Sequence, residues 1–173
     1  MGENDKLVVV INGRGGSGKD TLCGLAGKHF RVRNVSSITP IKEIALANGW
    51  DGQKDERSRK FLSDLKKLFS EYNDLPNRYL MRQYREFLEG DEEILFVHIR
   101  EAEEIRKFKD YVDGGCVTLL IHRSTGEEHP LGNDSDDRVE EYAYDASFDN
   151  NVSLEEAEEQ FVSLLKGLMH AKR

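Results

Sequence analysis

Short hydrophobic runs recur along the chain, and polar or glycine-containing segments separate them. The runs at residues 6–12, 94–99 and 116–121 are predicted to be buried strands, because each is short, continuous and rich in aliphatic residues. Two less apolar stretches, at 31–37 and 144–148, are expected to form a second and a fifth strand. The predicted strands are thus spread over the whole chain.

Between the predicted strands, hydrophobic residues recur three or four positions apart, which is the spacing of one helix face. The helices expected from this spacing cover residues 20–30, 41–48, 61–72, 77–88 and 102–111, with a last helix after Ser153. One apolar face of the third helix is predicted to consist of Phe61, Leu62, Leu65, Leu68, Phe69 and Tyr72. Ser153 and Glu156 have the spacing of a capping box at the start of the last helix.

Strands that alternate with helices indicate an α/β fold, in which a mostly parallel sheet carries helices on both faces. We therefore expect a three-layer sandwich around a five-stranded sheet, with residues 1–173 forming a single domain. Residues 38–90 would form a helical insertion between two strands. The stretch 124–137 is polar, with almost no hydrophobic residue, and is predicted to be a loop.

The composition is typical of a globular protein, since 38% of the 173 residues are hydrophobic and 34% are charged. A net charge of −8 argues against nucleic-acid binding as the main function, because phosphate backbones are bound by an excess of Lys and Arg. The longest apolar run near the start, residues 7–11, is too short for a signal peptide or a membrane span. We expect a cytoplasmic protein that binds small molecules and neither nucleic acid nor membrane; the sequence leaves a homodimer open.

A glycine-rich segment separates the first predicted strand from the helix that follows it. Residues 13–21 have the sequence GRGGSGKDT, which fits the phosphate-binding pattern G-x-x-x-x-G-K of a P-loop. Glycines let the backbone curl so that successive N–H groups face a phosphate, with the positive end of the helix dipole behind them. The residues predicted to bind ATP are Gly13, Gly15, Gly16, Ser17, Gly18, Lys19, Asp20 and Thr21.

The position after the P-loop lysine departs from the usual pattern. A Ser or Thr hydroxyl normally holds Mg²⁺ there, whereas this chain has Asp20 followed by Thr21. The Asp20 carboxylate could approach the metal directly or through water, although it would also repel phosphate oxygens. Thr21 and Asp20 are therefore both candidate Mg²⁺ ligands, and a structural cap at the start of the helix is an alternative role for Asp20.

Two arginines follow predicted strands at positions where a ligand could reach them. Arg100 comes directly after the third strand, and Arg123 follows the fourth. Ligands of parallel sheets bind outside the carboxyl ends of the strands, and these ends share one edge. Lys19, Arg100 and Arg123 are thus expected to lie at the same edge of the sheet, where their charges would favour a phosphorylated ligand.

The segment Gly16–Thr21 resembles the P-loop of nucleoside and deoxynucleoside monophosphate kinases, which have the adenylate kinase-like P-loop fold. Animal phosphomevalonate kinase is similar in its Gly-Lys-Asp. Three further segments resemble the monophosphate kinases in the same order along the chain: SSITPIKE at 36–43, VHIREAEEI at 97–105 and DNNVSLEE at 149–156. His98 departs from the resemblance, because these kinases commonly have Asp at that position.

The resemblance implies roles for several parts of the chain. Residues 38–90 would form the acceptor-binding arm and 124–137 a lid-like loop. Lys42 and Arg100 would bind the acceptor substrate. The residues that would act on the transferred phosphoryl group are Lys19, Arg100, Arg123 and Arg138.

Together these features predict a phosphotransferase that uses ATP and Mg²⁺ and moves the γ-phosphoryl group to a small phosphorylated acceptor. A (deoxy)nucleoside monophosphate is the acceptor that the resemblance favours. One alternative is a non-nucleotide phosphorylated metabolite such as phosphomevalonate. Another is a nucleotide-binding regulatory protein with little transfer activity, which His98 and the arginine-free loop 124–137 would favour. A GTPase fits less well, because the chain has no Asn-Lys-x-Asp segment.

Overall fold

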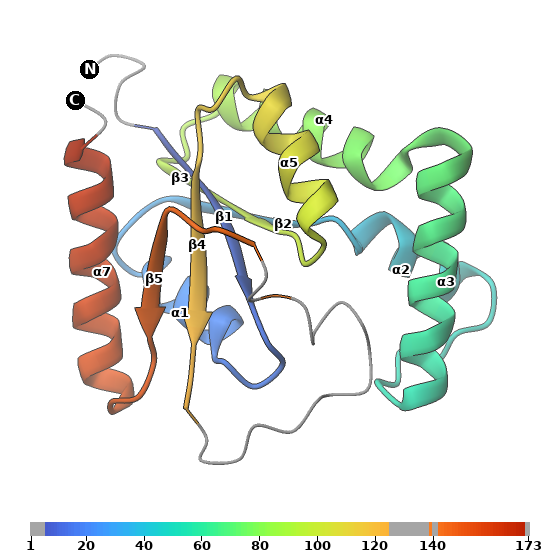
Figure 1. Cartoon of the computed structure of the whole chain (residues 1–173), viewed down its shortest axis with the longest axis horizontal. Helices are drawn as coiled ribbons and strands as arrows, with labels where there is room; N and C mark the ends of the chain where they lie inside the picture. The colour runs from blue at the N-terminus through green and yellow to red at the C-terminus, as the bar shows by residue number, and fades with distance from the viewer. Residues whose placement is uncertain (1–5, 125–138, 140–141, 172–173) are drawn as a thin grey trace.

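The computed structural model describes residues 6–124, 139 and 142–171. Within these residues, five parallel strands form one sheet in the order β2-β3-β1-β4-β5 (Figure 1). The strands are β1 (Leu7–Gly13), β2 (Val32–Ser36), β3 (Ile94–His98), β4 (Val117–His122) and β5 (Ala146–Asp149). The helices are α1 (Lys19–Ala26), α2 (Thr39–Ala47), α3 (Glu56–Asn73), α4 (Leu75–Glu89), α5 (Ala102–Tyr111) and α7 (Leu154–Ala171). The α/β fold predicted from the alternation of strands and helices is confirmed.

The central strand β1 contributes to hydrophobic cores on both faces of the sheet. Its side chains alternate, so that Leu7, Val9 and Ile11 belong to one buried cluster and Val8 and Val10 to the other. Helices α1 and α7 cover the first face, and α4 and α5 cover the second (Figure 1). Each fully buried aliphatic side chain stabilises the fold by about 1.5–3 kcal/mol. The two cores hold the middle of the sheet rigidly and leave the strand ends available for a site.

The register of the strands brings three of their carboxyl ends together. Ile11 of β1 lies beside His98, the last residue of β3. On the other side, Gly13 of β1 lies beside Ile121 of β4. The segments that follow β1, β3 and β4 therefore start at one edge of the sheet, as the sequence predicts.

The helical block between β2 and β3 has two parts. α2 and α3 lie beside the sheet with a small core of their own, formed by Ile41, Ala45 and Leu62 (Figure 1). α4 returns to the sheet, where Leu80 and Phe87 join the core of the second face. The insertion predicted at 38–90 thus contains both a lateral arm and one of the helices that cover the sheet.

The predicted apolar face of α3 is wrong in part. The residues that α3 buries are Ser58, Leu62 and Lys66, which are four positions apart. Phe61, Leu68 and Tyr72 lie on a neighbouring stripe and are 44%, 63% and 85% exposed. The spacing of hydrophobic residues alone misses this rotation, because a lysine occupies one of the three buried positions.

The end of α1 differs from the prediction, whereas the start of α7 agrees with it, and both have local causes. α1 ends at Ala26, earlier than predicted, and the Gly27 N–H bonds the carbonyl groups of Cys23 and Gly24. Glycine lowers helix propensity by about 1 kcal/mol, which favours this early end. At the start of α7, the Glu156 N–H donates to Ser153 Oγ over 3.3 Å, as half of the predicted capping box.

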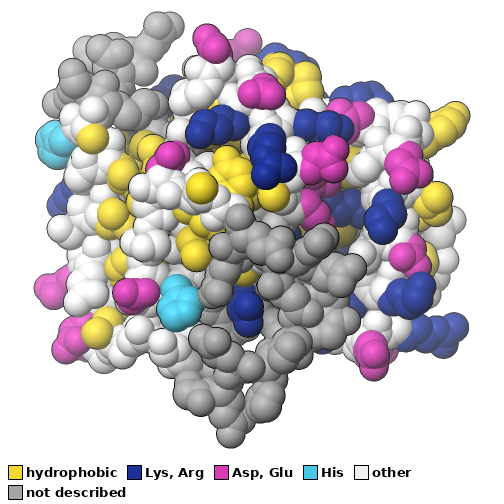
Figure 2. Space-filling model, viewed as in Figure 1, with side chains coloured by type: hydrophobic (Ala, Val, Ile, Leu, Met, Phe, Trp, Pro, Cys, Tyr) yellow, Lys and Arg dark blue, Asp and Glu magenta, His cyan; other side chains and the backbone are white. Residues whose placement is uncertain are grey.

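Charged side chains are mixed over the surface of the helical layer. In the space-filling view, Lys and Arg side chains alternate with Asp and Glu side chains over the side formed by α3, α4 and α5 (Figure 2). Among the helices that the structure describes, none is long and apolar enough to cross a membrane.

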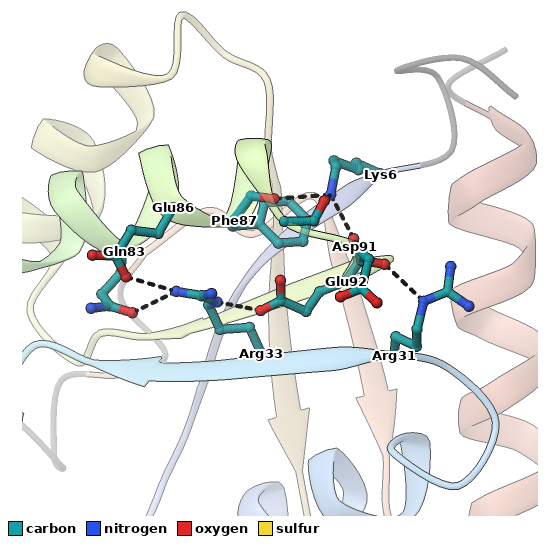
Figure 3. A network of polar contacts seen from close by, with 9 residues as sticks. Lys6, Arg31, Arg33, Gln83, Glu86, Phe87, Asp91 and Glu92 are labelled. Carbon is teal, nitrogen blue, oxygen red and sulfur yellow. Dashed lines mark hydrogen bonds and ion pairs between the residues drawn. The ribbon is translucent and has the colours of Figure 1, made fainter.

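A polar network closes the opposite edge of the sheet, at the amino ends of the strands (Figure 3). Lys6, directly before β1, donates to the carbonyl oxygens of Phe87, Gly90 and Glu92 over 2.9, 2.9 and 2.7 Å. Two of these acceptors lie at the end of α4, where the Phe87 carbonyl also accepts the Gly90 N–H over 3.2 Å. Arg33 of β2 bonds Gln83 and Glu86 of α4 as well as Glu92. The network therefore joins β1, β2 and β3 to the end of α4.

We expect Lys6→Met to destabilise the fold by about 1–3 kcal/mol, because three carbonyl groups lose a charged donor while the apolar stem stays similar. Urea unfolding of the two proteins measures the difference. Lys28→Met is a matched control, since the Lys28 side chain is 64% exposed and lies 3.8 Å from Glu158; it should change stability by less than about 0.5 kcal/mol. Equal stability of Lys6→Met and the unsubstituted protein would contradict a capping role for Lys6.

Candidate nucleotide and acceptor site

The glycine-rich turn after β1 has the backbone geometry of a phosphate-binding loop. It runs from Gly13 to Gly18, where α1 begins, and Ser17 N–H donates to the Arg14 carbonyl over 3.1 Å. Gly16 and Gly18 have φ angles of 84° and 85°, in the left-handed region that glycine adopts without strain. The loop therefore curls back over the start of α1, as the P-loop pattern predicts.

Gly18 is also held against the end of β5. Asn150, the first residue after β5, donates from Nδ2 to the Ser17 carbonyl over 2.8 Å and is 8% exposed. A Cβ at Gly18 would lie 2.4 Å from this Nδ2 atom. The Asn150 N–H in turn donates to the His122 carbonyl at the end of β4 over 2.7 Å. Asn150 thus ties the P-loop to β4 and β5.

A buried hydroxyl inside the loop lacks a hydrogen-bond partner among the described residues. This atom is Ser17 Oγ, and it lies 2.6 Å from where a Cβ at Gly13 would stand. Buried polar groups are normally satisfied, so the hydroxyl is suited to a ligand oxygen. The first N–H groups of α1 are free of side-chain caps within the described part of the chain. Both features fit the phosphate groups of a nucleotide.

The three residues that open α1 differ in exposure. Lys19 is half-buried, whereas the side chain of Asp20 is 90% exposed and Thr21 is exposed. The N-cap of α1 is Gly18, so Asp20 is not the structural cap that the sequence left open. No group of three or more His, Cys, Asp or Glu side chains in the described ranges is placed to hold a metal ion.

The segment after β3 is attached to the base of the P-loop through Asn12. This residue is fully buried, and its Nδ2 donates to the Arg100 carbonyl over 3.1 Å and to Tyr144 Oη over 2.8 Å. Its Oδ1 accepts the Gly13 N–H. The sequence analysis missed Asn12, although a polar residue at the end of an apolar strand and next to the loop is the available signal.

Lys42 of α2 is influenced by charged groups from several other segments. Burial lowers the pKa of Lys42, and the charges of Lys54 and Arg100 lower it further, while Asp20 opposes them. The Lys42 ammonium on α2 is therefore within electrostatic reach of the loop before α3, the end of β3 and the start of α1. Lys54 was not predicted, because its polar segment has no periodicity that would place it.

His98 ends β3 between the P-loop and β2. Its side chain is 11% exposed, Nε2 lies 3.1 Å from Asn34 Oδ1, and Nδ1 lies 3.7 Å from Asp20 Oδ1. Burial lowers the pKa of His98 from 6.5 to about 4; Lys19 and Arg100 lower it further, and Asp20 opposes them. The ring is therefore neutral at pH 7, and its contact with Asp20 is not an ion pair.

Arg123 lies at the same edge of the sheet as Arg100, and Arg138 lies outside the described residues. Arg123 is exposed and follows β4, on the side of β1 opposite to Arg100. Arg138 and the predicted lid, apart from Ser124, lie outside the described residues. Of the other predicted residues, Asp20 and Arg100 are within electrostatic reach of Lys42, and Lys19 is within reach of His98.

Comparisons with known proteins agree with this architecture. No protein-family model and no curated protein sequence matches the chain. The chain is similar to three solved structures, each with a TM-score of 0.51: a gluconokinase from Sinorhizobium meliloti, a shikimate kinase from Bacteroides thetaiotaomicron and the APS kinase of Mycobacterium tuberculosis bound to AMPPNP and APS. The fold is that of P-loop kinases.

The identities in these comparisons are low. They are 15% for the gluconokinase and the shikimate kinase and 14% for the APS kinase. The matches cover 96%, 95% and 94% of this chain, and 95%, 98% and 98% of the respective kinases. The likeness therefore establishes the fold along nearly the whole chain. The more specific resemblance to nucleoside monophosphate kinases stays a prediction.

The depressed pKa of His98 predicts a particular dependence of stability on pH. Between pH 6.5 and about 4 the unfolded chain takes up a proton on this ring and the folded protein does not, so the free energy of unfolding falls as the pH falls. His98→Gln should lack this contribution, which is roughly 2–3 kcal/mol over the full window. Urea unfolding at pH 4 and pH 7 compares the two proteins. An identical pH dependence in both would contradict a buried neutral ring.

Proposed function

We propose that this protein is an ATP-dependent phosphotransferase whose acceptor is a small phosphorylated molecule, in first place a (deoxy)nucleoside monophosphate. Two observations support the proposal: the backbone geometry of the P-loop, and Lys42, whose pKa is lowered by burial and by the charges of Lys54 and Arg100. A P-loop alone fits any nucleotide-binding protein. A second set of cations next to it fits a second phosphorylated substrate.

The donor part of the proposal rests on the P-loop geometry. The left-handed Gly16 and Gly18, the unpartnered Ser17 hydroxyl and the uncapped start of α1 within the described chain would hold the phosphates of ATP. Lys19 would add a positive charge at the β- and γ-phosphates. Mg²⁺, held by Thr21 or Asp20 together with those phosphates, would neutralise part of their charge.

The acceptor part rests on electrostatics. Burial lowers the pKa of Lys42, and repulsion by the charges of Lys54 and Arg100 lowers it further. A phosphate dianion placed among them would relieve this repulsion and form charge-assisted hydrogen bonds, and the Arg100 guanidinium could bind it in a bidentate manner. We therefore assign the lateral arm formed by α2 and α3 to acceptor binding, with Lys42 and Arg100 as its phosphate contacts.

Phosphoryl transfer needs alignment and positive charge more than covalent chemistry from the protein. Lys19 and Arg100 are both within electrostatic reach of His98, because the charge of each lowers its pKa. The neutral ring of His98 would offer a hydrogen bond and no charge. The roles of Arg123 and Arg138 at the transferred group, and of residues 124–137 as a lid, rest on the sequence resemblance.

Two other functions stay open for specific reasons. Lys42, Lys54 and Arg100 would recognise a phosphate, but not a base or a sugar. A non-nucleotide phosphorylated metabolite such as phosphomevalonate would therefore suit them equally. His98 supplies no charge at the end of β3, which would suit a nucleotide-binding regulatory protein with little transfer activity. Cytoplasmic location and the oligomeric state are further expectations from the sequence.

The test is ADP release from ATP and Mg²⁺ across a panel of nucleoside and deoxynucleoside monophosphates and phosphomevalonate. We expect release that depends on one class of acceptor, and we expect Lys19→Ala to abolish it, because the charge on the transferred phosphoryl group is lost. Lys28→Ala, on the exposed turn after α1, should keep full activity.

Three other results of this panel would each lead to a different conclusion about the function. Release with phosphomevalonate alone would replace the nucleotide acceptor by a metabolite. Binding of AMP-PNP without release for any acceptor would favour the regulatory protein. Unchanged turnover in Lys19→Ala would contradict the assignment of the P-loop itself.

A further inference from the structure

A partly buried charged cluster includes Glu101, the residue after Arg100, and has no part in the reaction described above; the Glu101 side chain is 36% exposed. Lys66 of α3 is 7% exposed, and its Nζ lies 2.8 Å from Glu101 Oε2 and 3.0 Å from Glu104 Oε2. The same ammonium donates to Ser37 Oγ over 2.9 Å. Lys66 thereby joins α3 to the turn after β2 and to the start of α5.

Placing these charged groups away from water costs desolvation free energy. Two carboxylates share one ammonium, and burial raises the pKa of Glu104, with Glu101 acting in the same direction and Lys66 against it. Buried ion pairs often contribute less to stability than hydrophobic residues of similar volume would. α3 buries Leu62 one turn earlier, so a hydrophobic residue would also suit the position of Lys66. The cluster therefore calls for an explanation other than stability.

The contacts of residues 99–101 supply such an explanation for the charged cluster. Ile99 is fully buried, the Arg100 carbonyl accepts a hydrogen bond from Asn12, and the Glu101 carboxylate bonds Lys66. Three successive residues are thus held by three different partners. Arg100, in the middle, has its backbone fixed on both sides while its guanidinium belongs to the proposed acceptor site.

We propose that Lys66 is a positioning residue which, through Glu101, fixes the segment carrying Arg100 and so orients its guanidinium toward the phosphate of the acceptor. Bidentate binding of a phosphate requires a defined orientation of the guanidinium plane, which a mobile backbone would not maintain. The ligand class is a phosphate monoester or inorganic phosphate. This inference rests on the proposed role of Arg100.

The two carboxylates provide a matched pair of variants. Glu101→Ala removes the contact between Lys66 and the Arg100 segment, whereas Glu104→Ala removes the other carboxylate and leaves that contact in place. In both variants Lys66 keeps one acidic partner, so both are expected to fold. Lys66→Met removes the ammonium itself, and Lys60→Met is its control, because the Lys60 side chain on the same helix is 78% exposed.

The measurement is the affinity of inorganic phosphate at Arg100, followed by the NMR signal of its Nε–H group in ¹⁵N-arginine-labelled full-length protein. Arg100→Lys assigns the signal, and Mg²⁺ with AMP-PNP fills the P-loop beforehand. We expect phosphate affinity to fall about tenfold in Glu101→Ala and Lys66→Met, because the guanidinium loses its orientation. Glu104→Ala and Lys60→Met should stay within about twofold of the unsubstituted protein.

Equal losses in Glu101→Ala and Glu104→Ala, or no loss in Glu101→Ala, would overturn the proposal. A failure of phosphate to shift the Arg100 signal in the unsubstituted protein would instead remove the acceptor role of Arg100, and with it the ligand named here. Amide hydrogen exchange over residues 99–101 then decides whether Lys66 positions the segment. Faster exchange in Glu101→Ala but not in Glu104→Ala supports positioning, and equal exchange excludes it.

Discussion

The turn from β1 into α1 is confined by its neighbours, and the rest of the site depends on this confinement. A Cβ at Gly13 would lie 2.8 Å from the Ile121 carbonyl of β4, and one at Gly18 would lie 2.4 Å from Asn150 Nδ2. The loop is therefore shaped by contacts with β4 and with the residue after β5, in addition to its own glycines. β4 pairs with β1 and with β5, and the hydrophobic core holds these strands in place. The packed sheet therefore fixes the position of the loop.

The side chains around this loop include several cations, although the chain as a whole is acidic. The chain carries a net charge of −8, yet the charges of Lys54 and Arg100 both reach Lys42 and lower its pKa. Asp20 is the acidic group that opposes them. Lys66 lies 2.8 and 3.0 Å from the carboxylates of Glu101 and Glu104, and Glu101 is next to Arg100 in the chain.

Much of the fold could be predicted from the sequence, because it is encoded in local patterns. The apolar run of β1, the glycines at 13–18 and the periodicity of α4, α5 and α7 each fall within a few adjacent turns of chain. The rotation of α3 could not be predicted, since its buried line includes Lys66, whose partners Glu101 and Glu104 are more than 30 residues away. Asn150 was missed for the same reason, because its significance comes from its bond to the Ser17 carbonyl, more than 130 residues away. The placement of Arg100 followed from a rule about parallel strands, which needs only the strand ends.

The central claim is that the turn between β1 and α1 binds a nucleotide, and an amide NMR titration with Mg²⁺ and AMP-PNP tests it most directly. The account predicts that the largest shifts fall on residues 13–21, with a further shift at Asn150, because its amide group bonds the Ser17 carbonyl. His98 should also respond, since Lys19 and Asp20 influence its ring. Shifts that are absent from residues 13–21, or that concentrate on α3 or α7, would contradict the account.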